Sequence, residues 1–401
     1  MSDIWKDWPS LYKACHNRPV VLFGRSDDWI DKNVRMFGKK AVGIVDNNKS
    51  LWGSSYAHLK IYRPSWLKSV KNPYIVISSG SYSGICKQLI EMGYDEGNDF
   101  CVTPYIKDLK VIDDIQEHNF NLLVSVPDHH NKRSKDKNRG GIYLFDSQEG
   151  LKQLIPGRYR QMTKANDYYF AIEHYDGLTK INSDFKIEKQ LCLETNSQAH
   201  GVAYCPPKNL VFVANTGLDK ITIHDGDTLK HLDDILFSDK IKHHDIQQHH
   251  INDLSVDENY LYVSYFSVSG NYRRGVFDGG ISQYDLNDLH NGRTDIVSDL
   301  WFPHSVKIIN NKMSYLDTMR GNFYVGIHHL TANFNGFLRG LDYDGKYYYI
   351  GQSVNTYASR LKGISNNIML NAGIYLYDIE NSVSIFYPID GVIDIHDVIA
   401  L

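Results

Sequence analysis

The sequence predicts a multidomain protein in which an N-terminal α/β domain precedes an all-β six-bladed β-propeller. Three observations carry this prediction. Strands alternate with helical stretches only in the first hundred or so residues. After that, polar anchors that open an apolar run recur at intervals of 35 to 57 residues, which is typical of propeller blades. Finally, the first group of strands lacks an inner strand, and the chain ends in one.

Composition excludes several classes of protein. The chain has 401 residues, 42% of them apolar, which is enough for a sizeable core. A net charge of −4 argues against a nucleic-acid partner. The five cysteines form no CxxC pair, which favours reduced thiols and a cytoplasmic protein. No run of 18 apolar residues occurs, so we expect no membrane insertion.

The α/β domain is expected at residues 1–106. Its helical stretches are 27–37 and the pattern that begins at Ile85. Strands are expected at 19–24, 41–45, 74–78 and 100–102. Alternation of this kind predicts a parallel sheet with crossover helices, and the length fits one mononucleotide-binding half.

Three features of this domain carry a resemblance: the strand that ends at Gly24, the acidic end of the second strand at Asp46, and the Ser/Gly-rich turn at 78–84. Over residues 18–105 the segment resembles the small Rossmann-like domains at the front of sugar-modifying enzymes of bacterial surface-polysaccharide pathways. The resemblance implies a nucleotide site, with Ser26, Asp46 and Ser81 as candidates. The turn after Gly24 has no second or third glycine, and Asp27 and Asp28 would repel a phosphate, so NAD is disfavoured.

A polar linker is expected at 107–118 and the propeller at 119–401. The first strand group, 121–128, 141–146 and 151–155, has no inner strand. The segment 394–401 is therefore predicted to pair beside 121–126 and close the ring, which removes the free edges of the sheet.

The strand anchors of successive blades are predicted to converge on one mouth of the central channel. These anchors are His200, Asn252, His304, Arg339 and His396, with His250 nearby. Three long insertions, 128–140, 267–279 and 353–372, belong to connections on the same side of the disc. Long loops above converging polar side chains are typical of binding sites.

The repeated region is similar to an uncharacterised family of bacterial six-bladed propellers. The matching segments are Asn252-Asp253-Leu254, Pro303-His304-Ser305, Leu316-Asp317 to Arg320-Gly321, the 337–341 run and Asp397-Val398. This resemblance implies a fold and a set of channel residues, and it implies no reaction.

The mouth residues allow several chemistries. Imidazoles from different blades can hold a divalent metal ion, for which His200, His304 and His396 are the candidate ligands. Alternatively, each imidazole bonds to backbone or to a channel water. Arg339 favours an anionic ligand. The candidate catalytic residues are His200, His304, Arg339 and His396; the candidate substrate-binding residues are Asn252, His250, Asp317 and Arg320.

Three functions remain open from the sequence. The first is a His/Arg-dependent enzyme, with or without a metal, that acts on a small anionic or carbohydrate ligand in surface-polysaccharide or nucleotide-sugar metabolism. The second is a non-catalytic propeller that binds a glycan or a protein partner. The third is a scaffold for polysaccharide assembly.

Overall fold

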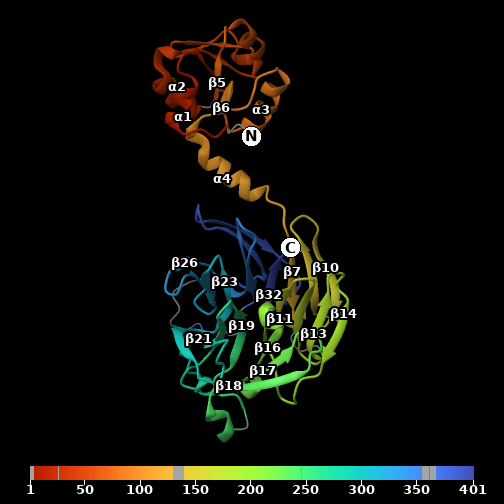
Figure 1. Ribbon diagram of the computed structural model, residues 1–401. Coiled ribbons are helices and arrows are strands. Elements are labelled where there is room, and N and C mark those ends of the chain that lie inside the picture. Colours follow the sequence, from red (N-terminus) through yellow and green to blue (C-terminus); the bar gives the residue numbers. More distant parts are fainter. Residues whose placement is uncertain (1–3, 26, 130–139, 245, 355–360, 362–366) are drawn as a thin grey trace. The chain divides into compact units, whose positions relative to one another are not determined.

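The protein folds into two units, Met1–Glu117 and His118–Leu401 (Figure 1). The structure is a computed structural model, and it describes the chain except for residues 1–3, 26, 130–139, 245, 355–360 and 362–366. Within the described part, no helix is long and apolar enough to cross a membrane.

The first unit is an α/β unit that combines a six-stranded mixed sheet with helices. Its strands lie in the order β3-β4-β2-β1-β5-β6, and all neighbours are parallel except β3 and β4. The strands are β1 (Val20–Phe23), β2 (Ala41–Val45), β3 (Ser55–Tyr56), β4 (Leu59–Tyr62), β5 (Tyr74–Ile77) and β6 (Phe100–Val102). The helices are α1 (Trp8–Ala14), α2 (Asp27–Phe37), α3 (Tyr82–Glu91) and α4 (Lys107–Gln116).

The central strands of this sheet are buried on both faces, which is why they read as unbroken apolar runs. Val20 and Leu22 of β1 pack into one core cluster, whereas Val21 and Phe23 pack into another on the opposite face. The four strands and the helix predicted over 27–37 all form. The short pair β3 and β4 was not predicted, and the Rossmann-like identity of the unit stays a prediction.

Most of the predicted linker is helical. Helix α4 turns one apolar side inward: Ile115 is buried, and Leu109 packs against the core of the first unit. The Tyr82 hydroxyl donates a hydrogen bond to Asp113 at 2.5 Å, which fastens α4 to α3.

The second unit is a six-bladed propeller of four-stranded antiparallel sheets, as predicted. Blade one holds β32 (Asp397–Ala400), β7 (Asn121–Val126), β9 (Gly141–Asp146) and β10 (Gly150–Pro156), from the channel outward. Blade two holds β11 (Tyr159–Ala165), β12 (Tyr168–Glu173), β13 (Gly177–Asn182) and β14 (Ile187–Leu191). Blade three holds β15 (Gly201–Cys205), β16 (Leu210–Asn215), β17 (Lys220–Asp225) and β18 (His231–Leu236).

The remaining blades repeat this arrangement. Blade four holds β19 (Ile251–Val256), β20 (Tyr260–Tyr265), β21 (Gly279–Asp285) and β22 (Thr294–Leu300). Blade five holds β23 (Pro303–Ile309), β24 (Lys312–Asp317), β25 (Asn322–Val325) and β26 (Leu330–Asn333). Blade six holds β27 (Phe337–Tyr343), β28 (Tyr348–Ser353), β29 (Gly373–Asp378) and β30 (Val383–Pro388). A two-stranded sheet of β8 (Asp128–His129) and β31 (Val392–Asp394) lies next to blade one, since β8 follows β7 and β31 precedes β32 in the chain.

The C-terminal strand closes the ring as the sequence predicts. Strand β32 pairs antiparallel with β7, with Asp397 opposite Ser125 and Ala400 opposite Leu122. It also contacts the inner strands of blades two and six, so the inner strands form a continuous ring. Val398 and Ile399 are buried in it.

Removal of residues 394–401 should therefore lower the melting temperature of the second unit far more than removal of Leu401 alone, whose side chain is exposed. The larger deletion exposes the edge of β7 and removes buried apolar surface. Thermal unfolding followed by circular dichroism measures the effect. An unchanged melting temperature after the larger deletion would refute this role of the closure.

Candidate binding site at the channel mouth

Histidines from four blades meet at one end of the channel. The ring centroid of His396 on blade one lies 5.9 Å from that of His200 on blade three and 6.2 Å from that of His304 on blade five. The His250 ring of blade four lies 5.2 Å from that of His200. Since His396 reaches across an intervening blade to both His200 and His304, these rings converge on the propeller axis.

Two arginines join this cluster. Arg339 precedes Gly340 on β27 at the level of His304 and His396, and its guanidinium lies 2.6 Å from the Asp394 carboxylate. Arg160 occupies the corresponding position on β11 and was not among the predicted anchors. The Arg160 guanidinium lies 3.2 Å from Nδ1 of His174. We call the following set the His/Arg mouth: Arg160, His200, His250, Asn252, His304, Arg339 and His396.

A ring of side chains one residue deeper closes the channel beneath the mouth. Gln161 accepts hydrogen bonds from the amides of Val202 and Leu254 and donates one to the Leu254 carbonyl. Asp253 accepts from the Ser305 amide, and the Ser305 hydroxyl accepts from the Gly340 amide. Each bond runs from one inner strand to another.

Asp397 completes this deeper ring by accepting from the Met162 amide at 3.0 Å. The glycine at position 201 is required by the close packing, because a Cβ there would lie 2.2 Å from the Asn252 carbonyl oxygen. We call Gln161, Asp253, Ser305 and Asp397 the plug.

The imidazoles of the mouth are held neutral. Burial lowers the pKa of His200, His304 and His396 well below the usual value, and the neighbouring guanidiniums act in the same direction. Burial, followed by Arg160, lowers the pKa of His250 to about 3. The guanidiniums of Arg160 and Arg339 are the charged groups of the mouth residues, and Arg339 is paired with Asp394. Two guanidiniums at one end of the channel favour an anionic ligand.

Several buried polar atoms of the mouth have no hydrogen-bond partner among the residues that the structure describes. Asn252 is 0% exposed, and neither its amide nitrogen nor its amide oxygen makes a hydrogen bond. His396 is 2% exposed, and both ring nitrogens are likewise unbonded, as is Nε of Arg339. Buried polar groups without a partner are costly, so a cluster of them calls for an explanation.

Other predicted site residues lie apart from this cluster. Asp317 and Arg320 pair with each other at 3.0 Å. Arg320 also contacts Asp299, and its guanidinium lies 5.0 Å from the Trp301 ring centroid. Their contacts join the end of β24 in blade five to the end of β22 in blade four and to Trp301, which follows it.

One of the three predicted loops is seen over the mouth. Tyr272, from the 267–279 loop, packs on His250 with ring centroids 4.6 Å apart. Asp278 accepts from the Ser267 hydroxyl at 2.5 Å, which fixes the base of that loop. Most of the other two, at 130–139, 355–360 and 362–366, lies outside the described residues.

The nucleotide candidates of the first unit are partly accounted for. Asp46 accepts hydrogen bonds from the amides of Arg25 and Asn48, each at 2.7 Å, so its carboxylate holds the turn after β1. Ser81 precedes α3, and its amide bonds to the Ser79 hydroxyl. Ser26 lies outside the described residues.

The metal prediction finds no support in the geometry. Among the residues that the structure describes, no group of three or more His, Cys, Asp or Glu side chains is arranged to hold a metal ion. Arg339 and Arg160 act on the same imidazoles, and their charges would repel a cation. The ligand set His200, His304 and His396 stays a prediction.

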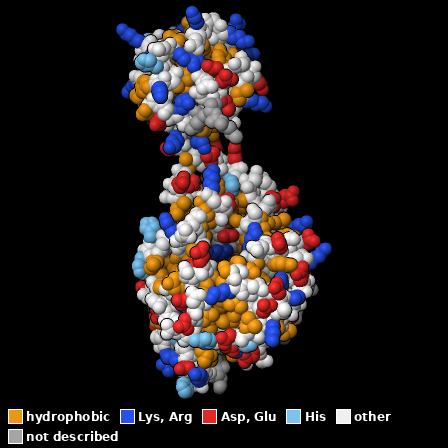
Figure 2. Space-filling model, in the orientation of Figure 1, with side chains coloured by type: hydrophobic (Ala, Val, Ile, Leu, Met, Phe, Trp, Pro, Cys, Tyr) orange, Lys and Arg blue, Asp and Glu red, His pale blue; other side chains and the backbone are white. Residues whose placement is uncertain are grey.

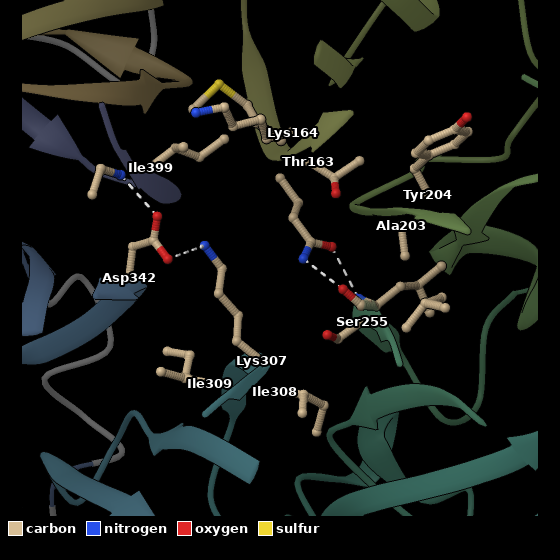
Figure 3. Close-up of a pocket in the computed structure, with 15 residues that line it drawn as sticks. Thr163, Lys164, Ala203, Tyr204, Ser255, Lys307, Ile308, Ile309, Asp342 and Ile399 are labelled. Atoms are coloured by element: carbon tan, nitrogen blue, oxygen red, sulfur yellow. Dashed lines mark hydrogen bonds and ion pairs between the residues drawn. The ribbon is translucent and has the colours of Figure 1, made fainter. Parts of the chain in front are cut away.

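The opposite end of the channel opens into a cavity of about 300 Å³ (Figure 3). Lys307 reaches toward Asp342 there, with 3.8 Å between Nζ and the carboxylate. Lys307 also donates to the Val398 carbonyl, and Asp342 accepts from the Ala400 amide. These charges hold the closing strand, which gives them a structural role. Figure 2 shows charged side chains in a hollow near the middle of the propeller.

Comparisons with known proteins give one family match and several solved structures of low sequence identity. Residues 17–98 match the family model described as C2185-like, N-terminal. No curated protein matches the chain.

Solved structures resemble the propeller at low identity. A nidogen/laminin complex is 9% identical, covers 70% of this chain and 97% of its own, and has a TM-score of 0.47. A protein of unknown function from Bacteroides caccae is 12% identical over 71% and 99% of the chains, with a TM-score of 0.46. Regucalcin from Agrobacterium tumefaciens, described as a calcium-binding protein, is 11% identical over 58% and 74%, with a TM-score of 0.40.

Truncation of two buried amide side chains should change the free energy of unfolding by very different amounts. Gln161→Ala leaves three backbone groups without partners and should cost about 3 kcal/mol of unfolding free energy. Asn252→Ala removes atoms that have no partner, so it should stay within about 1 kcal/mol of the native protein or exceed it. Urea unfolding measures both. Equal losses would contradict the assignment of Asn252 as unbonded.

Asp253→Asn should show a pH-dependent gain in stability. Burial raises the pKa of Asp253 to about 7, whereas the unfolded chain loses this proton near pH 4. Unfolding therefore releases a proton between these values, and Asp253 lowers the unfolding free energy as pH rises toward 7. The variant should gain about 2 kcal/mol over the native protein between pH 5 and pH 7. Parallel stability curves from urea unfolding would refute this.

Proposed function

We propose that the propeller binds a small anionic ligand at the His/Arg mouth. The observation that carries the proposal is the convergence of two guanidiniums and four neutral imidazoles on one end of the channel, where Asp394 supplies one carboxylate. Guanidinium groups form strong charge-assisted bonds with carboxylate and phosphate oxygens. The plug gives the site a floor, and Tyr272 gives it one wall.

Neutral imidazoles in such a site also favour an enzyme over a passive binder. A histidine that is neutral at pH 7 can accept a proton from a bound ligand, and the pKa of that imidazole rises when an anion offsets the nearby guanidiniums. His304 and His396 are the candidate acid–base groups, and Arg339 is the candidate anchor. The alternative is a glycan- or protein-binding propeller with the same anchor and no turnover.

The first unit offers a second candidate function. Its five parallel strands, numbered along the chain, lie in the order 3-2-1-4-5, an order used by nucleotide-binding sheets. Since the Asp46 carboxylate is engaged with one backbone amide in the turn after β1 and one in the turn after β2, we expect a nucleotide to bind weakly and without hydride transfer.

Inorganic phosphate is the simplest probe of the mouth. Calorimetric titration of the full chain at low ionic strength should detect binding, and Arg339→Gln should weaken it at least tenfold, because a charge-assisted bond is lost. The matched control is Arg320→Gln, which removes a guanidinium tied to Asp317 and should leave the affinity unchanged. Equal affinities of the native protein and the Arg339 variant, or a loss confined to the Arg320 variant, would refute the proposal.

A further inference from the structure

The unbonded atoms of the mouth indicate which hydrogen-bonding groups a ligand needs in addition to its charge. The Asn252 amide offers both a donor and an acceptor, and neither has a partner among the described residues. An ionised carboxylate or phosphate oxygen can only accept, so it can satisfy only the donor. A hydroxyl group both donates and accepts, and it can satisfy either atom.

His200 and His304 point to the same kind of partner. Nδ1 of His200 lies 2.7 Å from the Gln198 carbonyl, and Nδ1 of His304 lies 2.8 Å from the Phe302 carbonyl. Since a carbonyl can only accept, the proton of each neutral ring lies on Nδ1 and the lone pair on Nε2. Each ring therefore presents an acceptor, which an ionised acid group cannot satisfy and a hydroxyl can.

His396 adds a third requirement. Its two ring nitrogens are buried without a partner, so a neutral ring there offers one donor and one acceptor. His396 sits on blade one, between Arg339 on blade six and Arg160 on blade two. The donor of His396 can thus share an anionic group with the guanidiniums, while its acceptor needs a hydroxyl.

We infer that the ligand of the mouth is an acid that carries several hydroxyl groups. Its carboxylate or phosphate group binds at Arg339 and Arg160. Its hydroxyl groups satisfy Asn252 and the lone pairs of His200 and His304, and its carbon skeleton packs near Tyr272. This inference rests on the proposed function and narrows it from any small anion to an acid that carries several hydroxyl groups.

A matched set of probes separates charge from hydroxyl recognition. Gluconate and hexanoate have the same charge and six carbons, and they differ in hydroxyl groups. Glucuronate, galacturonate and glucose 6-phosphate extend the set, with methyl glucoside as the uncharged sugar and inorganic phosphate as the bare anion. Calorimetry on the full chain should find at least one hydroxylated acid that binds tenfold or more tightly than hexanoate, phosphate and methyl glucoside.

The outcomes distinguish the two proposals. If hexanoate or phosphate binds as tightly as the best hydroxylated acid, the inference is wrong and the anion site stands. If methyl glucoside binds as tightly as the best acid, the charge plays no part and both proposals fail. If no probe binds, both proposals fail as well.

Asn252→Ala tests the hydroxyl contact within the site. The variant should reduce the preference for the best hydroxylated acid over hexanoate at least fivefold and leave the affinity for hexanoate unchanged. Arg339→Gln should weaken both acids. Asn215→Ala is the matched control, because Asn215 is equally buried but bonds to Val213 and Thr222 within blade three. A preference that survives Asn252→Ala unchanged would overturn the inference.

Discussion

The plug is the interaction on which the architecture of the channel depends. Six inner strands meet at the axis with their edges toward one another, and Gln161 bonds from blade two to the inner strands of blades three and four. Asp253 and Asp397 perform the same task between other blades. These bonds satisfy backbone groups that the channel would otherwise leave without partners, and they require a glycine at 201, where a Cβ would meet the Asn252 carbonyl.

The plug also determines what the two ends of the channel can do. At one end, Lys307 and Asp342 bond to the closing strand, so their charges serve the closure of the ring. At the other end, the mouth residues sit above the plug. The side chains of Asn252 and His396 are buried there, and their polar atoms have no partner among the described residues, as is also true of one carboxylate oxygen of Asp253 in the plug. Buried polar atoms without a partner are rare, so their concentration at this end of the channel supports a ligand there.

The repeat of the strand anchors made the propeller, its closure and the shared place of the histidines predictable from the sequence. Inner strands converge whatever their sequence, so aligned anchors must meet at the axis. Arg160 was not predicted because it lies in a polar stretch, Arg158 to Gln161, and the apolar residue that marks the inner strand, Met162, comes only after the anchor. Asp317 and Arg320 were placed in the site by their nearness to a strand end, and sequence alone does not show that they bond to each other. The pairing of β3 with β4 was missed since strands of two and four residues carry little periodicity.

The electrostatics of the mouth favour one of the two chemistries that its histidines allow. A metal site needs neutral imidazoles whose nitrogens meet around one point. The imidazoles here are neutral, but the added charges are guanidiniums, and the Asp394 carboxylate is bound to one of them. An anion, by contrast, would be attracted by the charges of Arg160 and Arg339. Its own charge would raise the pKa of the imidazoles between them. Under the proposed function, the same residues that would repel a metal ion would couple the binding of an acid to the protonation of His396.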